Sequence, residues 1–201
     1  MKVSKQFKKS FSYTWYLYLL AIVLPAILFP LSYSFMHRPK QYETLALFVP
    51  VSLKTEKAED MMFEDLKNLG IRTTDITNVE TNENEMNFSK KISVVAYNRC
   101  DIIILPEDKL SKVGIETASL ELNNEIKELC KVSAENIYSY NEIEYGIEIP
   151  HDTPLLKYVD FEESANYYAF INSKSWNIGQ YSSQKVTTEN TFKLMQYILG
   201  K

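Results

Sequence analysis

An uninterrupted apolar stretch near the N-terminus is the strongest pattern along the chain. No charged residue occurs between Tyr13 and Phe35. About 20 residues of helix, rising about 1.5 Å each, cross a hydrocarbon layer of about 30 Å, so residues 13–36 are long enough to form a transmembrane helix. Aromatic residues, whose rings suit the two membrane–water interfaces, gather at both ends of the stretch: Tyr13, Trp15, Tyr16, Tyr18, Tyr33 and Phe35.

A cleaved signal peptide is the alternative interpretation of this segment. Its basic N-terminus suits one, but the apolar stretch is longer than a usual signal core, and the sequence LFPLSYSFMHRP offers no small-x-small cleavage motif. These features favour an uncleaved anchor. Pro25 and Pro30 each remove a backbone donor inside it, which predicts a bend or a contact of the membrane helix with another protein at these positions.

Positive charges on the two sides of the segment set its expected orientation. The tail of residues 1–12 is basic and short, and the positive-inside rule places such a tail in the cytoplasm. We therefore expect a linker over residues 37–43 and an extracytoplasmic domain over residues 44–201. The charges weighed are Lys2, Lys5, Lys8 and Lys9 before the span and His37, Arg38 and Lys40 after it.

Beyond the linker, the pattern changes to alternating strands and helices. Residues 44–51 are apolar on both faces, as expected of a buried strand. Residues 55–70 follow as a helix that ends at Gly70. Apolar residues recur in it at helical spacing: Ala58, Met62, Leu66 and Leu69.

The same alternation continues to residue 106. Residues 71–79 predict a second, more polar strand, and residues 88–97 predict a helix. Residues 101–106 predict the most strongly apolar strand of the part that follows the linker, which we call the body. This order indicates parallel neighbours with right-handed crossovers. The predicted fold class is therefore α/β, with an N-terminal transmembrane helix followed by a mainly parallel βαβαβ-type extracytoplasmic domain.

The second half is less regular. Its pattern predicts a helix over residues 118–130, short strands at 137–140 and 145–149, a clear strand at 167–171 and a final helix over 188–199.

Charge distinguishes the two parts of the chain. The net charge is −4, but the first 38 residues hold five basic and no acidic side chains, which leaves 17 basic against 26 acidic groups in the remainder. An acidic body in a chain with three arginines argues against nucleic acid as a partner, because that binding rests on clustered cations. The length of the body allows one domain of about 150 residues.

The sequence offers little that indicates catalysis. His151 lies in a turn-like segment beside Asp152 and is either a general base or, as we favour, a surface-loop residue, because no nucleophile stands at a recognisable spacing. A zinc site needs several His or Cys ligands, and no glycine-rich nucleotide motif occurs. We therefore predict a non-enzymatic protein with no cofactor and no metal. Cys100 and Cys130 form either a disulfide or, as we favour, two buried thiols.

Polar residues that follow strands are the candidate contact sites. Glu107 and Asp108 come directly after the strand at 101–106, where ligand-contacting groups lie in open α/β sheets; a solvated turn is the alternative. Trp176 and Asn177 follow a later strand, and an aromatic face with polar neighbours is common in ligand sites; packing of this loop onto the last helix is the alternative.

Several segments together resemble parts of type II periplasmic solute-binding proteins, over roughly residues 42–200. They are a first strand that ends in an open turn, FSKKISVVAYNRC with DIIILPEDKL, YYAFINSKSWNIG and TENTFKLMQYIL. They are most similar to the shortened, membrane-anchored versions in low-GC Gram-positive bacteria. In that family two α/β lobes clamp a ligand between the C-terminal ends of their strands and deliver it to a permease. The resemblance implies a reduced solute-binding-like domain with ligand or partner contacts at Ser52, Glu107, Asp108, Trp176 and Asn177.

Two functions follow from these observations. The first is a single-pass protein of the bacterial plasma membrane that acts as an accessory or assembly subunit of a membrane complex, such as an ABC-type transporter. It would contact an integral membrane protein partly through Pro25 and Pro30. The second is a membrane-tethered receptor that delivers a small molecule to a permease.

Overall fold

The chain forms two compact units, residues Met1–Pro39 and Lys40–Lys201. The computed structural model describes residues 3–36, 40, 44–71, 73–78, 85–132, 136–183 and 188–201. Most of the expected linker, the cations Lys2, His37 and Arg38, and the expected end of the second strand at Val79 lie outside the described residues.

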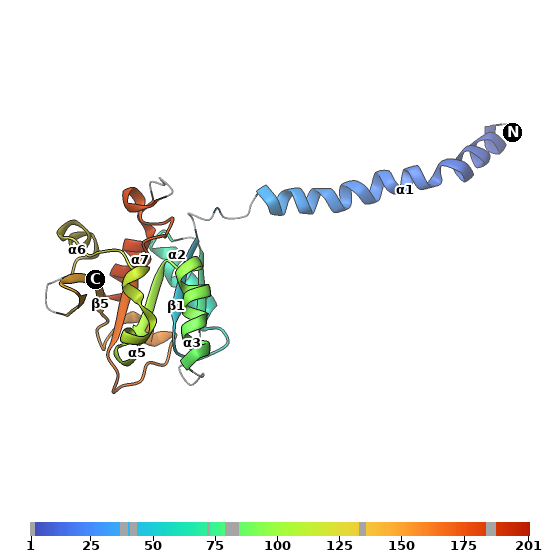
Figure 1. Ribbon diagram of the computed structural model, residues 1–201. Coiled ribbons are helices and arrows are strands. Elements are labelled where there is room, and N and C mark those ends of the chain that lie inside the picture. The colour runs from blue at the N-terminus through green and yellow to red at the C-terminus, as the bar shows by residue number, and fades with distance from the viewer. Residues whose placement is uncertain are drawn as a thin grey trace. The chain divides into compact units, whose positions relative to one another are not determined.

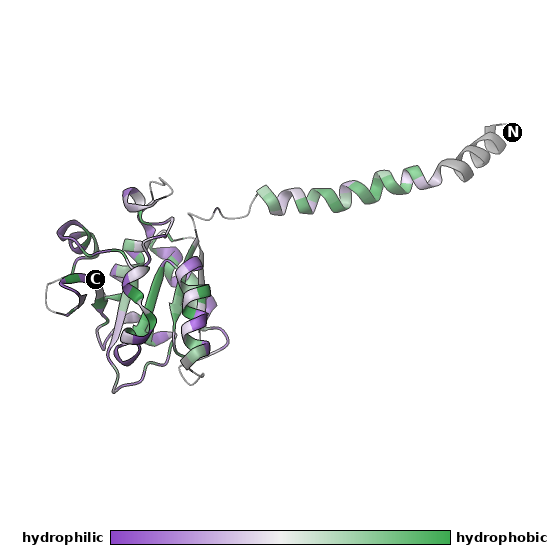
Figure 2. Cartoon of the chain, viewed as in Figure 1, coloured by the Kyte–Doolittle hydropathy of each residue, from purple (hydrophilic) through white to green (hydrophobic). Residues whose placement is uncertain are grey.

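The first unit is the helix α1 (Val3–Met36), which runs through both Pro25 and Pro30. Its segment Trp15–Met36 has 22 residues and a mean hydropathy of 2.1, and it is exposed throughout. Figure 2 shows this apolar run along the helix. Within the described residues, α1 is the one helix long and apolar enough to cross a membrane.

The second unit, the body, is built on one six-stranded sheet with the order β2-β1-β3-β6-β5-β4 (Figure 1). The central strand of the first half, β1, is parallel to both β2 and β3. This confirms the predicted α/β class and its βαβαβ arrangement, while β6, β5 and β4 pair antiparallel. The strands are β1 (Thr44–Val49), β2 (Thr73–Asn78), β3 (Ile102–Pro106), β4 (Ile137–Tyr140), β5 (Ile143–Glu148) and β6 (Tyr167–Ile171).

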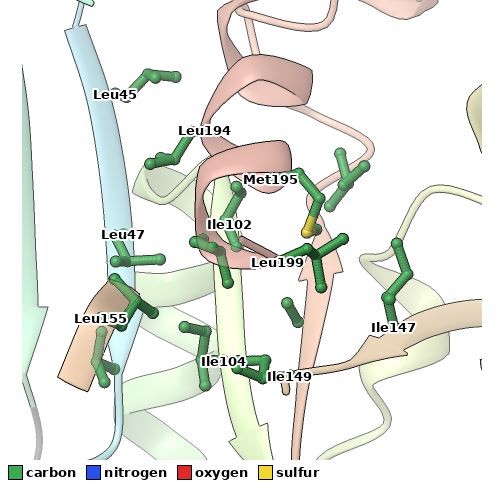
Figure 3. Close-up of a cluster of buried hydrophobic side chains, with 14 of the residues drawn as sticks. Leu45, Leu47, Ile102, Ile104, Ile147, Ile149, Leu155, Leu194, Met195 and Leu199 are labelled. Atoms are coloured by element: carbon green, nitrogen blue, oxygen red, sulfur yellow. The ribbon is translucent and has the colours of Figure 1, made fainter. Parts of the chain in front are cut away.

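One face of the sheet packs against α2 (Ala58–Asn68), α6 (Asn124–Cys130) and α7 (Asn190–Ile198). Because side chains alternate along a strand, Leu45 and Leu47 of β1 point to this face. Figure 3 shows them with Ile102 and Ile104 of β3 around the side chains of α7 and the residue after it. The predicted packing of Ala58, Met62 and Leu66 is confirmed, since all three are buried in this cluster.

The other face carries a second apolar cluster, in which Phe48, Ile103 and Phe170 pack under helices. These helices are α3 (Glu85–Lys91), the π-helical turn η2 (Ile92–Ala96), α4 (Tyr97–Arg99) and α5 (Glu107–Val113). Three short 3₁₀ turns complete the described elements: η3 (Ile115–Thr117), η4 (Pro154–Lys157) and η5 (Gly179–Tyr181). The sheet is therefore covered on both faces, which explains why β3 is buried at every position.

Two sequence predictions are corrected by the structure. The helix expected over 118–130 begins only at Asn124, because the preceding segment extends along β6: the Leu120 amide donates to the Ile171 carbonyl (2.7 Å) and Ser119 bridges to Asn172. Leu69 does not join the buried face of α2. It follows the last helical residue and is 47% exposed.

Cys100 and Cys130 are both buried and are not joined in a disulfide, as favoured from the sequence. Burial raises the pKa of the Cys130 thiol to about 12.

Candidate functional site

A surface cavity of about 520 Å³ lies at the C-terminal end of β3. It is lined by the residues that follow β3 and by the loop that leads into β6. In an open α/β sheet this edge is where ligands bind, because the loops after parallel strands converge there. Glu107 and Asp108, the two acids that directly follow this buried strand, both line the cavity.

The first of these acids is held in place by the opposite loop. Pro106 has an extended backbone and ends β3, so α5 begins at Glu107. The Glu107 amide donates to the Asn166 carbonyl (3.0 Å), and the Asn166 side-chain amide donates to Glu107 Oε2 (3.1 Å). Asp108 is more open, with a side chain 66% exposed that pairs with Lys109 at 3.2 Å. The carboxylate of Asp108 is therefore accessible to a partner.

A second cavity, of about 370 Å³, adjoins the first and shares three lining residues with it, Glu162, Ala165 and Tyr167. We call the two together the acidic groove, because five acids against two lysines line it: Glu107, Asp108, Asp160, Glu162 and Glu163, with Lys54 and Lys109. His151 lies in its lining as an exposed turn residue.

Two aromatic rings pack against each other in the lining of the acidic groove. The ring centroids of Phe161 and Tyr167 are 4.5 Å apart, and the ring planes are tilted by 46°. The Tyr167 hydroxyl accepts a hydrogen bond from the Glu162 amide (3.3 Å), and burial raises the pKa of this tyrosine. Acidic, aromatic and hydrogen-bonding groups in one open groove suit non-covalent recognition of a positively charged or polar surface.

Ser52 lies near this edge but lines neither cavity. Its side chain is exposed, and its carbonyl accepts a hydrogen bond from the Asp160 amide (3.2 Å). The bond ties the turn after β1 to the loop that carries the acids of the groove.

Trp176 and Asn177 lie at the opposite edge of the sheet, where β1 and β3 begin, so the structure does not bring them together with Glu107 and Asp108. Trp176 is half-buried and Asn177 is 1% exposed. The Asn177 side-chain amide donates to the Thr44 carbonyl (2.9 Å) and to Asp101 Oδ1 (3.2 Å). Asn177 therefore joins the loop after β6 to the beginnings of β1 and β3.

Asp101 is the centre of this network and was not among the residues predicted from the sequence. Its Oδ1 also accepts from the Ser175 hydroxyl (2.5 Å), and its Oδ2 accepts from the Ala46 amide (2.7 Å). Burial raises the pKa of Asp101, and these hydrogen bonds oppose the rise. The one signal in the sequence was a carboxylate at the head of the otherwise apolar run DIIILP.

The placement of possible metal ligands decides whether the acids of the groove could bind a metal ion. Across the described ranges, no group of three or more His, Cys, Asp or Glu side chains is placed to hold a metal ion. The five acids of the acidic groove therefore line it without forming a chelating cluster.

Comparisons with known proteins give only distant similarity. No family model matches the chain, and no curated protein matches it. Among solved structures, the chain is similar to the maltodextrin-binding protein MalE1 of L. casei BL23 without ligand (TM-score 0.34, 10% identity, 53% of this chain and 29% of that one). It is also similar to a cyclo/maltodextrin-binding protein complexed with maltotetraose (TM-score 0.33, 13% identity, 55% of this chain and 29% of that one). The chain spans less than a third of these proteins, and TM-scores this low carry no argument about function.

Proposed function

We propose that the chain is a non-enzymatic protein anchored in the bacterial plasma membrane by α1, and that its body is an extracytoplasmic accessory or assembly subunit of a membrane complex such as an ABC-type transporter. The observation that supports this proposal is that one chain joins a membrane-length helix with two internal prolines to a body that carries an open acidic groove.

The membrane helix supports a partner in the bilayer. Pro25 and Pro30 each leave a carbonyl of the preceding turn without its usual backbone donor, and in hydrocarbon such a group is costly unless a neighbouring helix or side chain satisfies it. We therefore assign part of the contact to the Pro25–Pro30 region. The basic residues at the start of the chain support a cytoplasmic N-terminus, by the positive-inside rule.

The body supports a role in recognition by charge. Five acids against two lysines give the acidic groove a negative field, which attracts a basic segment of a partner and rejects an acidic one. Asp108 and Glu162 are both exposed, so a partner can reach them without rearrangement of the fold.

A second candidate is a membrane-tethered receptor for a small molecule. The observation that favours it is the size of the first cavity, about 520 Å³, which falls within the range of about 300–1,000 Å³ common for small-molecule sites. The subunit function is preferred because the groove is open and five acids line it, which suits a charged protein surface.

The experiment is co-purification of the tagged full chain from its native membrane. Exchange of residues 13–35 for an unrelated span of equal length, and separately Asp108→Lys, are each expected to reduce recovery of an integral membrane partner. Glu128→Lys on the exposed surface of α6 is the matched charge control and should leave recovery unchanged.

Unchanged recovery after the span exchange would remove the helix contact from the proposal. A measurable affinity for a small molecule, lost in Asp108→Asn, would instead support the receptor.

A further inference from the structure

A small cavity of about 80 Å³ opens at the edge of the sheet opposite the acidic groove, and it shares no lining residue with that groove. We call it the Asp101 pocket. Asp101, Ser175 and Asn177 form its buried part, and the exposed residues Arg99 and Lys174 also line it. The pocket thus has an acidic, buried interior and two exposed cations.

The Asp101 pocket contains a buried acceptor without a donor. Asn177 is 1% exposed, and its side-chain nitrogen is used in bonds to Thr44 and Asp101. Its oxygen, Oδ1, has no hydrogen-bond partner within the described residues. Because native structures rarely leave a buried polar atom unpaired, this atom indicates that a donor enters from outside.

The same interior contains a buried charge without a counterion. Asp101 is 6% exposed and accepts hydrogen bonds from Ser175, Asn177 and Ala46. In the part of the chain that the structure describes, no Lys or Arg forms an ion pair with it. A buried carboxylate is unfavourable unless it is paired, so a cationic donor would satisfy Asp101 and Asn177 Oδ1 together.

We propose that the Asp101 pocket binds a small zwitterion, whose primary ammonium group donates to Asp101 and Asn177 Oδ1 and whose anionic group pairs with Arg99 and Lys174. A simple anion is rejected by the two interior acceptors. A simple cation is repelled by the two exposed cations. In a molecule whose two charges are separated by one or two carbon atoms, the positive group matches the acidic interior and the negative group matches the two exposed cations.

The size of the pocket limits the ligand. A water molecule occupies about 30 Å³, so about 80 Å³ holds an ammonium group with one or two carbon atoms and excludes a sugar ring. Trp176 is half-buried in the lining and supplies an apolar face for the carbon atoms. Free amino acids and the phosphoethanolamine headgroup of a lipid share this chemistry.

Calorimetric titration of the full chain in a nonionic detergent tests the proposal. Glycine and O-phosphoethanolamine are the two probes, and binding of one without the other identifies the source. Acetate is the matched control, because it is smaller than glycine, keeps the carboxylate and has no ammonium group. We expect it to bind at least about tenfold more weakly than glycine, as the loss of a charge-assisted hydrogen bond implies. Binding of neither probe, or equal binding of acetate, would overturn the proposal.

Variants locate the site. Asp101→Asn keeps the shape of the side chain and removes its charge, and Lys174→Gln changes only an exposed residue, which keeps the test valid if the first variant does not fold. Asp101→Asn should weaken binding by about tenfold or more. Lys174→Gln should weaken it by about two- to fivefold, because an exposed ion pair contributes less, whereas Glu128→Gln on α6 should leave it unchanged. Unchanged affinity in Lys174→Gln and in a folded Asp101→Asn would refute the assignment. The acidic groove plays no part in this test, so its outcome is independent of the proposed subunit function.

Discussion

The pairing of β5 with β6 requires a glycine at position 146, because a side chain there would clash with the opposite strand. It lies in β5 opposite Phe170 of β6. A Cβ atom at this position would stand 2.4 Å from Phe170 Cε1 and 2.7 Å from Cζ. The ring has no free space to move into, because Phe170 is fully buried and the ring of Tyr138 packs edge-on to it at 5.6 Å.

Gly146→Ala should therefore destabilise the body by overpacking, which costs about 1–3 kcal/mol. For a chain of this length, about 1 kcal/mol shifts Tm by about 2–4 °C, so we expect Tm to fall by about 2–12 °C. Thermal unfolding of the full chain in detergent, followed by near-ultraviolet circular dichroism, reports the loss of aromatic packing. Gly70→Ala is the contrasting variant. Gly70 has a left-handed φ of +79°, which strains any side chain, but nothing lies within 4 Å of the added Cβ atom, so no overpacking is expected there.

A double variant separates the clash from other effects. In a Phe170→Leu background the smaller side chain leaves room, so Gly146→Ala should cost less there than in the wild type. Contacting residues commonly show coupling of about 0.5–3 kcal/mol. Strict additivity of the two changes, or a Gly146→Ala protein with wild-type Tm, would refute this account of the strand pairing.

Four further predictions follow from the same structure. Ile103→Asp places an unpaired charge in the centre of the sheet and should remove several kcal/mol of stability; wild-type melting would mean that β3 is not central. The stability of Asp101→Asn relative to wild type should rise as pH is raised from 4 through the folded-state pKa of Asp101, because burial raises that pKa and penalises the charged form of Asp101, a penalty that the amide does not carry; a difference that does not change with pH would contradict it. Cys130 should resist thiol reagents at pH 8 until urea is added, since burial raises its pKa to about 12; rapid labelling without urea would contradict it. Protease added to intact protoplasts should digest the body, because the body is expected outside the membrane; a body that resists digestion would contradict the proposed orientation.

The first half of the fold could be predicted because β1 and β3 are largely buried on both faces. The runs at 45–51 and 102–106 are continuously apolar, and such runs indicate strands covered by helices on two sides. The helix predicted over 118–130 is wrong before Asn124, for a physical reason. Apolar residues spaced as in a helix also suit an extended segment, and the choice is made by the Leu120 bond to Ile171, 51 residues along the chain.

The candidate sites were predictable to different extents. Glu107 and Asp108 follow a recognisable buried strand, and the general position of ligand sites in open α/β sheets made them candidates. Both line the acidic groove, and their contact with a ligand or partner stays a prediction. The network around Asp101 was not predictable, because its partners Ser175 and Asn177 lie 74 and 76 residues away in the sequence. No local pattern records such a pairing.

The most direct test of the subunit function is photo-crosslinking in intact cells. A photoreactive amino acid replaces Asp108 in the acidic groove of the full chain, and in a second strain it replaces Glu128 on the exposed surface of α6, which lines neither cavity of the groove. The account predicts a crosslink from position 108 to one integral membrane protein and none from position 128. Equal crosslinking from both positions, or no crosslink from position 108, would contradict the claim that this groove joins the chain to a membrane complex.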